Sequence, residues 1–172
     1  MTTPFTPDPY AAALAAAHEV HTREESDRLL KTYRLLFGKG GRRRQPMTRV
    51  ELHERIVAGV PYGCLFHLTE ELHDIPEKLV AETFTISTRT LLRHKERPET
   101  IMPPDLGSKT WMLAEIVAMA EDVMGSRKDA EKWLLSPAMG LNGSRPIDLL
   151  RTQQGAQLVS EFLERLRHGV YT

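Results

Sequence analysis

The side chains with the clearest capacity for chemistry are basic and hydroxyl groups gathered in residues 87–97. This stretch carries several cations and a single acid, Glu96. Guanidinium and hydroxyl groups donate hydrogen bonds to phosphates and to base edges, so the pattern is typical of a helix that contacts DNA. The candidate DNA-binding residues are Ser87, Thr88, Arg89, Thr90, Arg93, Lys95 and Arg97.

The surrounding residues, 77–94, have the pattern of a helix-turn-helix. Such a motif needs a small residue where its two helices touch, and Ala81 supplies it. The apolar residues expected on the facing sides are Val80, Phe84, Ile86 and Leu91. Thr85 stands where the turn usually has a glycine, and Ser87 is placed to cap the second helix. Two ordinary core helices joined by a short turn are the alternative interpretation.

Other candidate chemistry is weak. Cys64, His67 and His73 match no structural zinc spacing, so no metal site is predicted. The arginines at 42–44 fit either phosphate binding or a solvated linker. Residues 38–41 are rich in glycine but lack the Gly-Lys-Ser/Thr order of a phosphate-binding loop. No nucleophile elbow or Ser-His-Asp spacing is present, so the sequence predicts neither an enzyme nor a bound cofactor.

Apolar periodicity and the placement of glycine and proline predict that helices position these groups and that the chain is almost entirely helical. The expected helices span residues 10–37, 48–59, 61–72, 76–84, 87–95, 109–124, 126–136, 144–150 and 152–168. Residues 38–46 are predicted to be a flexible basic linker. The alanine-rich start of the first helix offers little area to bury, so we expect it to dock loosely. The last helix should face the core with Leu158, Val159, Phe162, Leu163 and Leu166.

Composition fits a folded, soluble chain of one or two small domains. The 172 residues include 23 Lys plus Arg against 23 Asp plus Glu, and 41% of them are hydrophobic. No apolar run approaches the roughly 20 residues that cross a bilayer, and no signal-peptide pattern opens the chain. The single cysteine, Cys64, excludes an intramolecular disulfide and fits a reducing compartment. We therefore expect a cytoplasmic protein without a membrane partner.

The C-terminal block carries a family pattern. It is Trp133-Leu134-x-x-Pro137, then Leu141-x-Gly143-x-x-Pro146-x-x-Leu149-Leu150-x-Thr152-x-x-Gly155, followed by Val159, Leu163, Arg165 and Gly169. This arrangement resembles the toxin-binding domain of the Xre/MbcA/ParS antitoxins, and the resemblance extends upstream over residues 48–172. In one departure, residues 108–111 read Ser-Lys-Thr-Trp where the family usually has a Ser-Asp-Arg-Leu-like stretch.

Helical periodicity, the glycine and proline segments and the resemblance together predict an all-α protein with four parts, the first of which lies outside the resemblance. Residues 1–46 are an N-terminal helical or flexible extension with a basic linker, and residues 47–98 are an Xre-like helix-turn-helix domain. Residues 99–107 are a linker, and residues 108–172 are the toxin-binding domain. Most of the apolar motif residues would build this last domain rather than touch the partner.

The resemblance also implies the partners. The cognate toxin would carry a RES domain and act on NAD, and the end of this chain would block its NAD pocket. The candidate toxin-binding residues are Arg165, Arg167, His168, Gly169, Val170, Tyr171 and Thr172. A homodimer within a hetero-oligomeric complex would bind operator DNA and so be associated with the nucleoid. The alternative is a stand-alone helix-turn-helix transcription regulator whose C-terminal block only dimerises.

Overall fold

The computed structural model describes residues 9–38 and 49–169. In these two ranges the regular elements are all helical, which confirms the predicted fold class. They are α1 (Pro9–Phe37), α2 (Arg49–Ala58), α3 (Tyr62–Glu71), α4 (Glu77–Phe84), α5 (Thr88–Lys95), α6 (Pro104–Met124), α7 (Arg127–Leu135), the 3₁₀ turn η1 (Met139–Leu141), α8 (Pro146–Leu149) and α9 (Gln153–Arg167). Among the described residues, no helix is long and apolar enough to cross a membrane.

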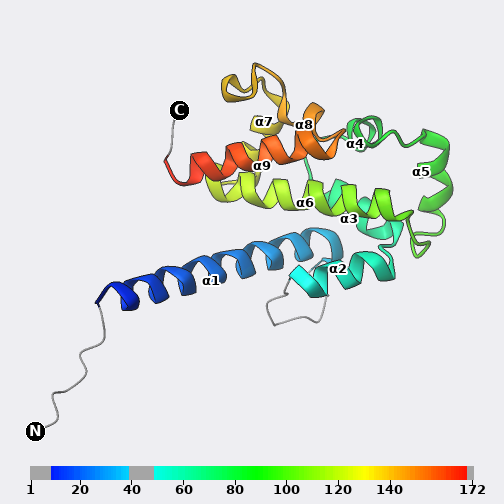
Figure 1. The fold of residues 1–172 in the computed structure, drawn as a ribbon. Coiled ribbons are helices and arrows are strands. Elements are labelled where there is room, and N and C mark those ends of the chain that lie inside the picture. The colour runs from blue at the N-terminus through cyan, green and yellow to red at the C-terminus, as the bar shows by residue number, and fades with distance from the viewer. Residues whose placement is uncertain (1–8, 39–48, 170–172) are drawn as a thin grey trace, which may run out of the picture.

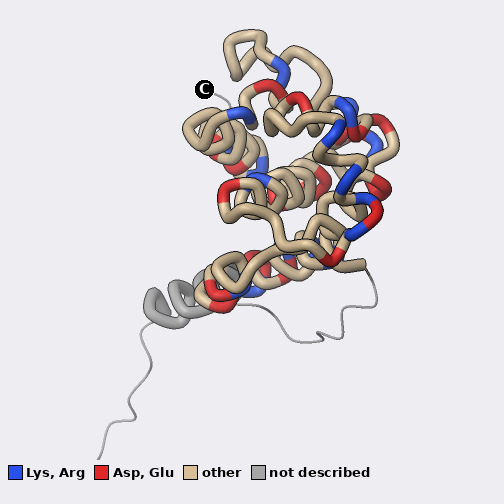
Figure 2. The backbone as a smooth tube through the Cα atoms, turned by 90° about the vertical axis from the view of Figure 1, so that its right-hand side faces the viewer, with Lys and Arg blue, Asp and Glu red and all other residues tan. Residues whose placement is uncertain are grey.

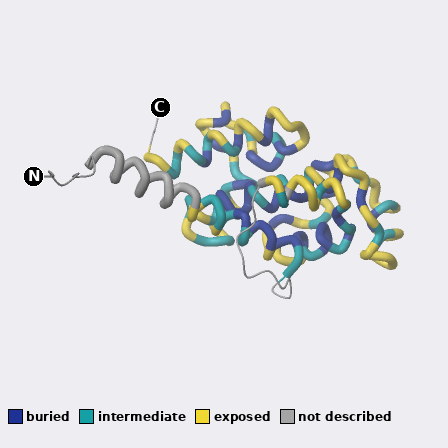
Figure 3. The backbone as a smooth tube through the Cα atoms, turned by 60° about the horizontal axis from the view of Figure 1, so that its bottom comes forward, coloured by how far each residue is buried: buried dark blue, intermediate teal, exposed yellow. Residues whose placement is uncertain are grey.

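Helix α6 is the central element of the fold. It runs lengthwise between α1 on one side and α9 on the other (Figure 1). A helix that is apolar on every face must be surrounded by protein, and α6 buries residues around its whole circumference. Its alanines Ala114, Ala118 and Ala120 are at most 1% exposed, and these small side chains let neighbouring helices approach closely. The buried residues form one continuous core, and the outer helix faces carry the exposed positions (Figure 3).

The second half of α1 is part of this core. Leu29, Tyr33 and Leu36 are buried at spacings of three and four, which places them on one face of the helix. His67 of α3 places its Nδ1 3.1 Å from the Leu35 carbonyl oxygen and so ties the two helices together. The loose docking predicted for the alanine-rich start concerns side chains outside the described residues. The predicted basic linker also lies outside them, apart from Gly38.

In the predicted linker, Met102, Leu106 and Gly107 are buried, and most of the other residues are exposed. The backbone N–H of Met102 donates to Val60, and that of Tyr62 donates to Thr100, at 2.8 and 2.9 Å. Helix α6 then begins at Pro104, ahead of the predicted start at Lys109. Proline is well tolerated in a first helical turn because that turn's N–H groups have no intrahelical partner. Pro103 and Pro104 therefore stand at the start of α6.

The C-terminal helices begin and end where the sequence indicates. The hydroxyls of Ser126 and Thr152 cap α7 and α9 by accepting from the N–H groups of Asp129 and Gly155, each at 3.1 Å. Gly155 is required for packing, because an added Cβ would overlap the carbonyl oxygen of Leu149. One residue that we expected to face the core does not do so. Leu158 is 54% exposed, because its position on α9 faces away from α6.

Candidate functional site

The turn between α4 and α5 has the backbone that the sequence pattern requires. Thr85 adopts the left-handed conformation with φ 60° and ψ 40°, a position that usually favours glycine. The N–H of Ile86 donates to the Ala81 carbonyl at 2.8 Å, which closes the end of α4. The small residue and most of the apolar set are buried between the helices, namely Ala81, Val80, Phe84 and Leu91, while Ile86 is partly buried. The local geometry is thus a tight helix pair with a short turn.

The predicted DNA-binding residues fall into two groups. Three of them hold the fold: the hydroxyl of Ser87 caps α5 by accepting from the N–H of Thr90 at 3.1 Å, and Lys95 pairs with Glu77 at 2.9 Å. Four point to solvent, Thr88, Arg89, Arg93 and Arg97, all of them exposed. The guanidinium groups of Arg89 and Arg97 have no hydrogen-bond or ion-pair partner among the described residues, although the backbone N–H of Arg97 donates to His94. Arg93 lies 3.0 Å from the ring of His94.

Charge on this side of the molecule is mixed. Figure 2 looks onto the α5 side and shows lysine and arginine positions interspersed with acidic ones. Arg89 and Arg93 lie one turn apart on α5 and are exposed. Behind them, the His94 ring stacks on Tyr62 with centroids 3.8 Å apart and planes within 5°. This contact anchors the end of α5 to α3 and leaves the arginine face open.

The predicted toxin-binding residues occupy the last turn of α9 and beyond. Arg165 is exposed and lies over the Phe162 ring, its guanidinium carbon 5.7 Å from the ring centroid. Arg167 turns toward α1 and forms an ion pair with Glu24. His168 places Nε2 3.7 Å from Glu164, and Gly169 ends the helix with φ 67°. Val170, Tyr171 and Thr172 lie outside the described residues, so the expected tail contacts stay a prediction.

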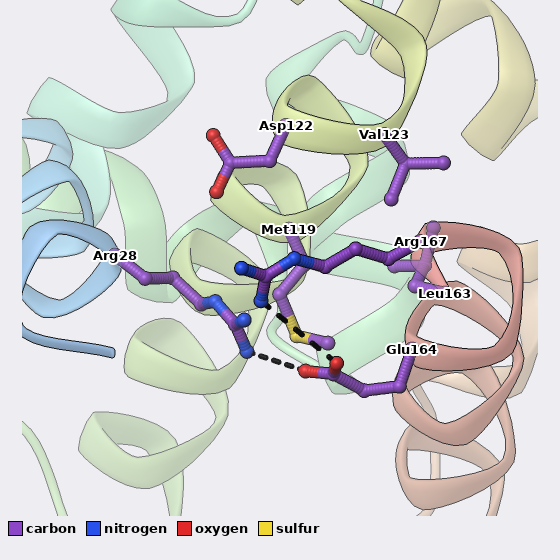
Figure 4. A pocket seen from close by; sticks show the side chains of 7 residues that line it. All are labelled: Arg28, Met119, Asp122, Val123, Leu163, Glu164 and Arg167. Atoms are coloured by element: carbon purple, nitrogen blue, oxygen red, sulfur yellow. Dashed lines mark hydrogen bonds and ion pairs between the residues drawn. The ribbon is translucent and has the colours of Figure 1, made fainter. Parts of the chain in front are cut away.

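Sequence reasoning missed the charge cluster that holds this last turn. Glu164 accepts from Arg28 of α1 at 2.6 Å, and its second oxygen lies 4.0 Å from Arg167 (Figure 4). Lys31 of α1 pairs with Asp122 of α6 close by. The spacing of Glu164, Arg167 and His168 signals a charged helix face, but a partner 136 positions away in the chain leaves no mark in local sequence. The end of α9 is therefore fixed by α1.

A groove of about 590 Å³ opens beside this cluster, between α1, α6 and α9. Its walls carry both signs of charge around one methionine, and the lining residues are Arg28, Glu115, Met119, Ser160, Glu161, Glu164 and Arg165. Among the described residues, no group of three metal-binding side chains comes together. The one cysteine, Cys64, is 3% exposed. Burial raises the pKa of its thiol to about 11, against a smaller lowering by the Arg55 charge, so it is a packing residue and a poor nucleophile.

In the described ranges, the C-terminal helices present charged and aromatic groups, among them Arg165 over Phe162 and the stacked pair Trp133 and Phe162. Residues 119–169 match the family described as "Antitoxin Xre/MbcA/ParS C-terminal toxin-binding domain". This part of the chain is thus similar to the toxin-binding domain of antitoxins.

Relatives extend this similarity over most of the chain. An Antitoxin Xre of Pseudomonas putida is 34% identical over 119 residues, which cover 69% of this chain and 72% of that protein. An Antitoxin Xre of Yersinia enterocolitica is 26% identical over 68% of this chain and 81% of its own length. A protein named Prs ADP-ribosylating antitoxin, from a Sphingobium species, is 25% identical over 75% of this chain and 84% of its own. The chain belongs to the Xre/MbcA/ParS antitoxin family, as its C-terminal pattern indicated, and the family is not enzymatic.

Proposed function

We propose that this antitoxin neutralises a RES-domain toxin by covering its NAD pocket and that it represses its own operon by binding DNA. The observation that carries the first part is the end of α9, which the matched toxin-binding domain includes up to Gly169. One relative is named an ADP-ribosylating antitoxin, and ADP-ribosylation consumes NAD, which agrees with an NAD-using partner. Inhibition of this kind is steric and needs no chemistry from the antitoxin.

The tail supplies the test of pocket occlusion. A guanidinium offers paired donors to carboxylates, and a tyrosine ring fills an aromatic-sized slot, so Arg165 and Tyr171 suit such a pocket. We expect deletion of residues 169–172 to restore NAD consumption by the toxin while the complex still assembles and the antitoxin keeps its melting temperature. Full inhibition by the truncated chain would refute the role of the tail.

The DNA-binding part is supported by α4 and α5. The left-handed turn at Thr85 and the cap at Ser87 give the compact helix pair of a helix-turn-helix, with α5 as its second, solvent-facing helix. Such a helix presents residues of its N-terminal half to base edges and phosphates. Arg89 lies in that half, and none of the described residues engages its guanidinium group. A homodimer would place two such helices about 34 Å apart, matching successive major grooves.

The operator test compares Arg89→Ala with Arg151→Ala, which removes an equally exposed arginine outside α5. Titration of the promoter DNA next to the antitoxin gene should show a loss of about 1–3 kcal/mol for Arg89→Ala and little change for the control. A loss confined to the operator would indicate base reading, and an equal loss on random DNA would indicate a phosphate contact. Unchanged operator affinity for an Arg89→Ala, Arg93→Ala double variant would remove α5 as the reader.

A further inference from the structure

Helix α9 has three distinct faces. At about 100° per residue, Val159 and Leu163 lie on one face, and both are buried against the core. Glu164 and Arg167 lie on a second face, which meets α1. Leu158, Phe162 and Arg165 fall within an arc of about 60° on the third. This third face meets η1 and the Trp133 ring of α7, and the described part of the chain ends just beyond it at Gly169, which has φ 67°.

Aromatic and apolar groups from two other segments extend this third face. Trp133 of α7 stacks parallel to Phe162, with centroids 6.1 Å apart and planes within 6°, and both side chains are partly buried. Leu158 is 54% exposed, and Met139 of η1 is 91% exposed. Arg165 lies over the Phe162 ring. We call Met139, Leu158, Phe162 and Arg165, backed by Trp133, the η1–α9 surface.

Gly140 shows how η1 is held against this face. Its φ is not positive, so no backbone strain requires glycine there. A side chain would instead collide with the Phe162 ring, since an added Cβ would lie 2.7 Å from Cζ. Glycine therefore lets η1 lie directly on Phe162, and the preceding residue of η1, Met139, is open to solvent. Because Met139 is 91% exposed, its side chain buries almost no apolar area in the isolated chain.

We propose that the η1–α9 surface is the docking site for the toxin, which would present an apolar surface bordered by carboxylates. This inference rests on the antitoxin function and deepens it by separating where the toxin is held from where it is inhibited. All residues of the surface lie within the matched toxin-binding segment, 119–169. Tryptophan, phenylalanine, methionine and arginine are the side chains enriched in interface cores. Because Arg165 places a positive charge within this surface, a partner with carboxylates around its apolar centre fits it best.

The direction in which the η1–α9 surface runs along α9 also fits the toxin as its occupant. Leu158, Phe162 and Arg165 lead in sequence toward Gly169, over a rise of about 16 Å at 1.5 Å per residue. A toxin held on this face would thus meet the emerging end of the chain without any rearrangement of α9. Val50 and Val57 are also exposed apolar residues, but they lie on α2, outside the toxin-binding segment.

The test measures affinity for a catalytically inactive form of the toxin encoded beside this chain. We expect Met139→Asp and Leu158→Asp each to weaken the complex at least about tenfold. The matched control is Val57→Asp, which places the same charge at a residue 69% exposed and should leave the affinity unchanged. Because all these positions are exposed, melting temperatures should stay at the parent value.

The outcomes separate this inference from the proposed function. Parental affinity in both η1–α9 variants, with tail deletion still releasing NAD consumption, would overturn the docking surface and leave pocket occlusion standing. Weakened complexes in which saturating antitoxin still inhibits would support docking and assign inhibition to the tail. A parent chain that fails to bind the toxin would overturn both. Loss of affinity in Arg165→Glu, which reverses the charge, together with parental affinity in Arg165→Lys, which keeps it, would support an acidic rim on the toxin.

Discussion

Replacing Glu164 with glutamine should weaken the contact between α1 and the end of α9. Glu164 is the centre of the charge cluster: Arg28 donates to it at 2.6 Å, and Arg167 and His168 lie within 4.0 Å. Glutamine keeps the size of the side chain and one accepting oxygen but removes the negative charge. The variant therefore tests the electrostatic contribution alone.

The magnitude follows from the exposure of the two partners. Exposed ion pairs contribute about 0–1 kcal/mol, and breaking a buried pair costs about 3–5 kcal/mol. The Arg28 side chain is 13% exposed and that of Glu164 is 37% exposed, so this pair lies between the two limits. We expect Glu164→Gln to lower the free energy of unfolding by about 1–2 kcal/mol, which for a chain of this size lowers the melting temperature by about 3–6 °C.

Urea unfolding at low and high salt is the decisive assay. Screening shortens the reach of charges to about 3 Å at 1 M salt, so the difference between parent and variant should shrink there. The control, Glu161→Gln, removes a carboxylate on the same helix that accepts only from Gln157 among the described residues. If Glu164→Gln and the control unfold alike at low salt, the ion pairs contribute nothing and apolar packing alone holds α1.

Three further changes test other contacts. Gly155→Ala should cost about 1–3 kcal/mol in urea unfolding, because its Cβ overlaps the Leu149 carbonyl oxygen; a neutral effect would mean that α8 yields easily. Glu131→Ala should cost about 2–4 kcal/mol, because Glu131, 1% exposed, accepts from the N–H groups of Asp74 and Ile75; a cost near zero would show that water replaces it. The Cys64 thiol, with its pKa raised to about 11, should react with Ellman's reagent at pH 8 more than about tenfold slower in the folded chain than in urea; equal rates would disprove its burial.

The same pKa shift sets the sign of a pH effect. Because burial disfavours the Cys64 thiolate, the folded chain holds this proton more tightly than the unfolded chain does. The stability that depends on it is fully present below the pKa of an unfolded thiol. It is lost as the pH rises toward about 11.

Local features of the fold were predictable because their causes are local. The caps at Ser87, Ser126 and Thr152 each depend on a hydroxyl and an N–H three residues later, and sequence displays both. The left-handed turn at Thr85 was likewise visible from its position between two apolar patterns. The close contact of Gly155 with Leu149 is also local, since the two residues are six positions apart in the chain.

Long-range features were not predictable in this way. Nothing near Glu131 in the sequence shows that it caps backbone groups of Asp74 and Ile75, far away in the chain. The start of α6 at Pro104 was expected five residues later, at Lys109, and the pairing of Met102 with Val60 just ahead of it joins residues far apart in the chain. Leu158 fits the apolar stripe of α9 by its spacing. It is nevertheless exposed, because its position on α9 faces away from α6.

The charge cluster gives a physical reason for the long helix α1 ahead of the toxin-binding segment. Helix α9 is anchored at its start by the Thr152 cap and the close contact at Gly155, but its last turn would fray without partners, as helix ends do. Glu24 and Arg28 of α1 supply those partners. Because α9 ends at Arg167, in the turn that α1 contacts, α1 would also fix the point at which the proposed inhibitory tail begins. In the proposed mechanism this lowers the entropy lost when the tail enters the toxin pocket, because its origin is ordered before binding. Weakening α1 should therefore reduce inhibition even though α1 lies on the opposite side of α9 from the η1–α9 surface.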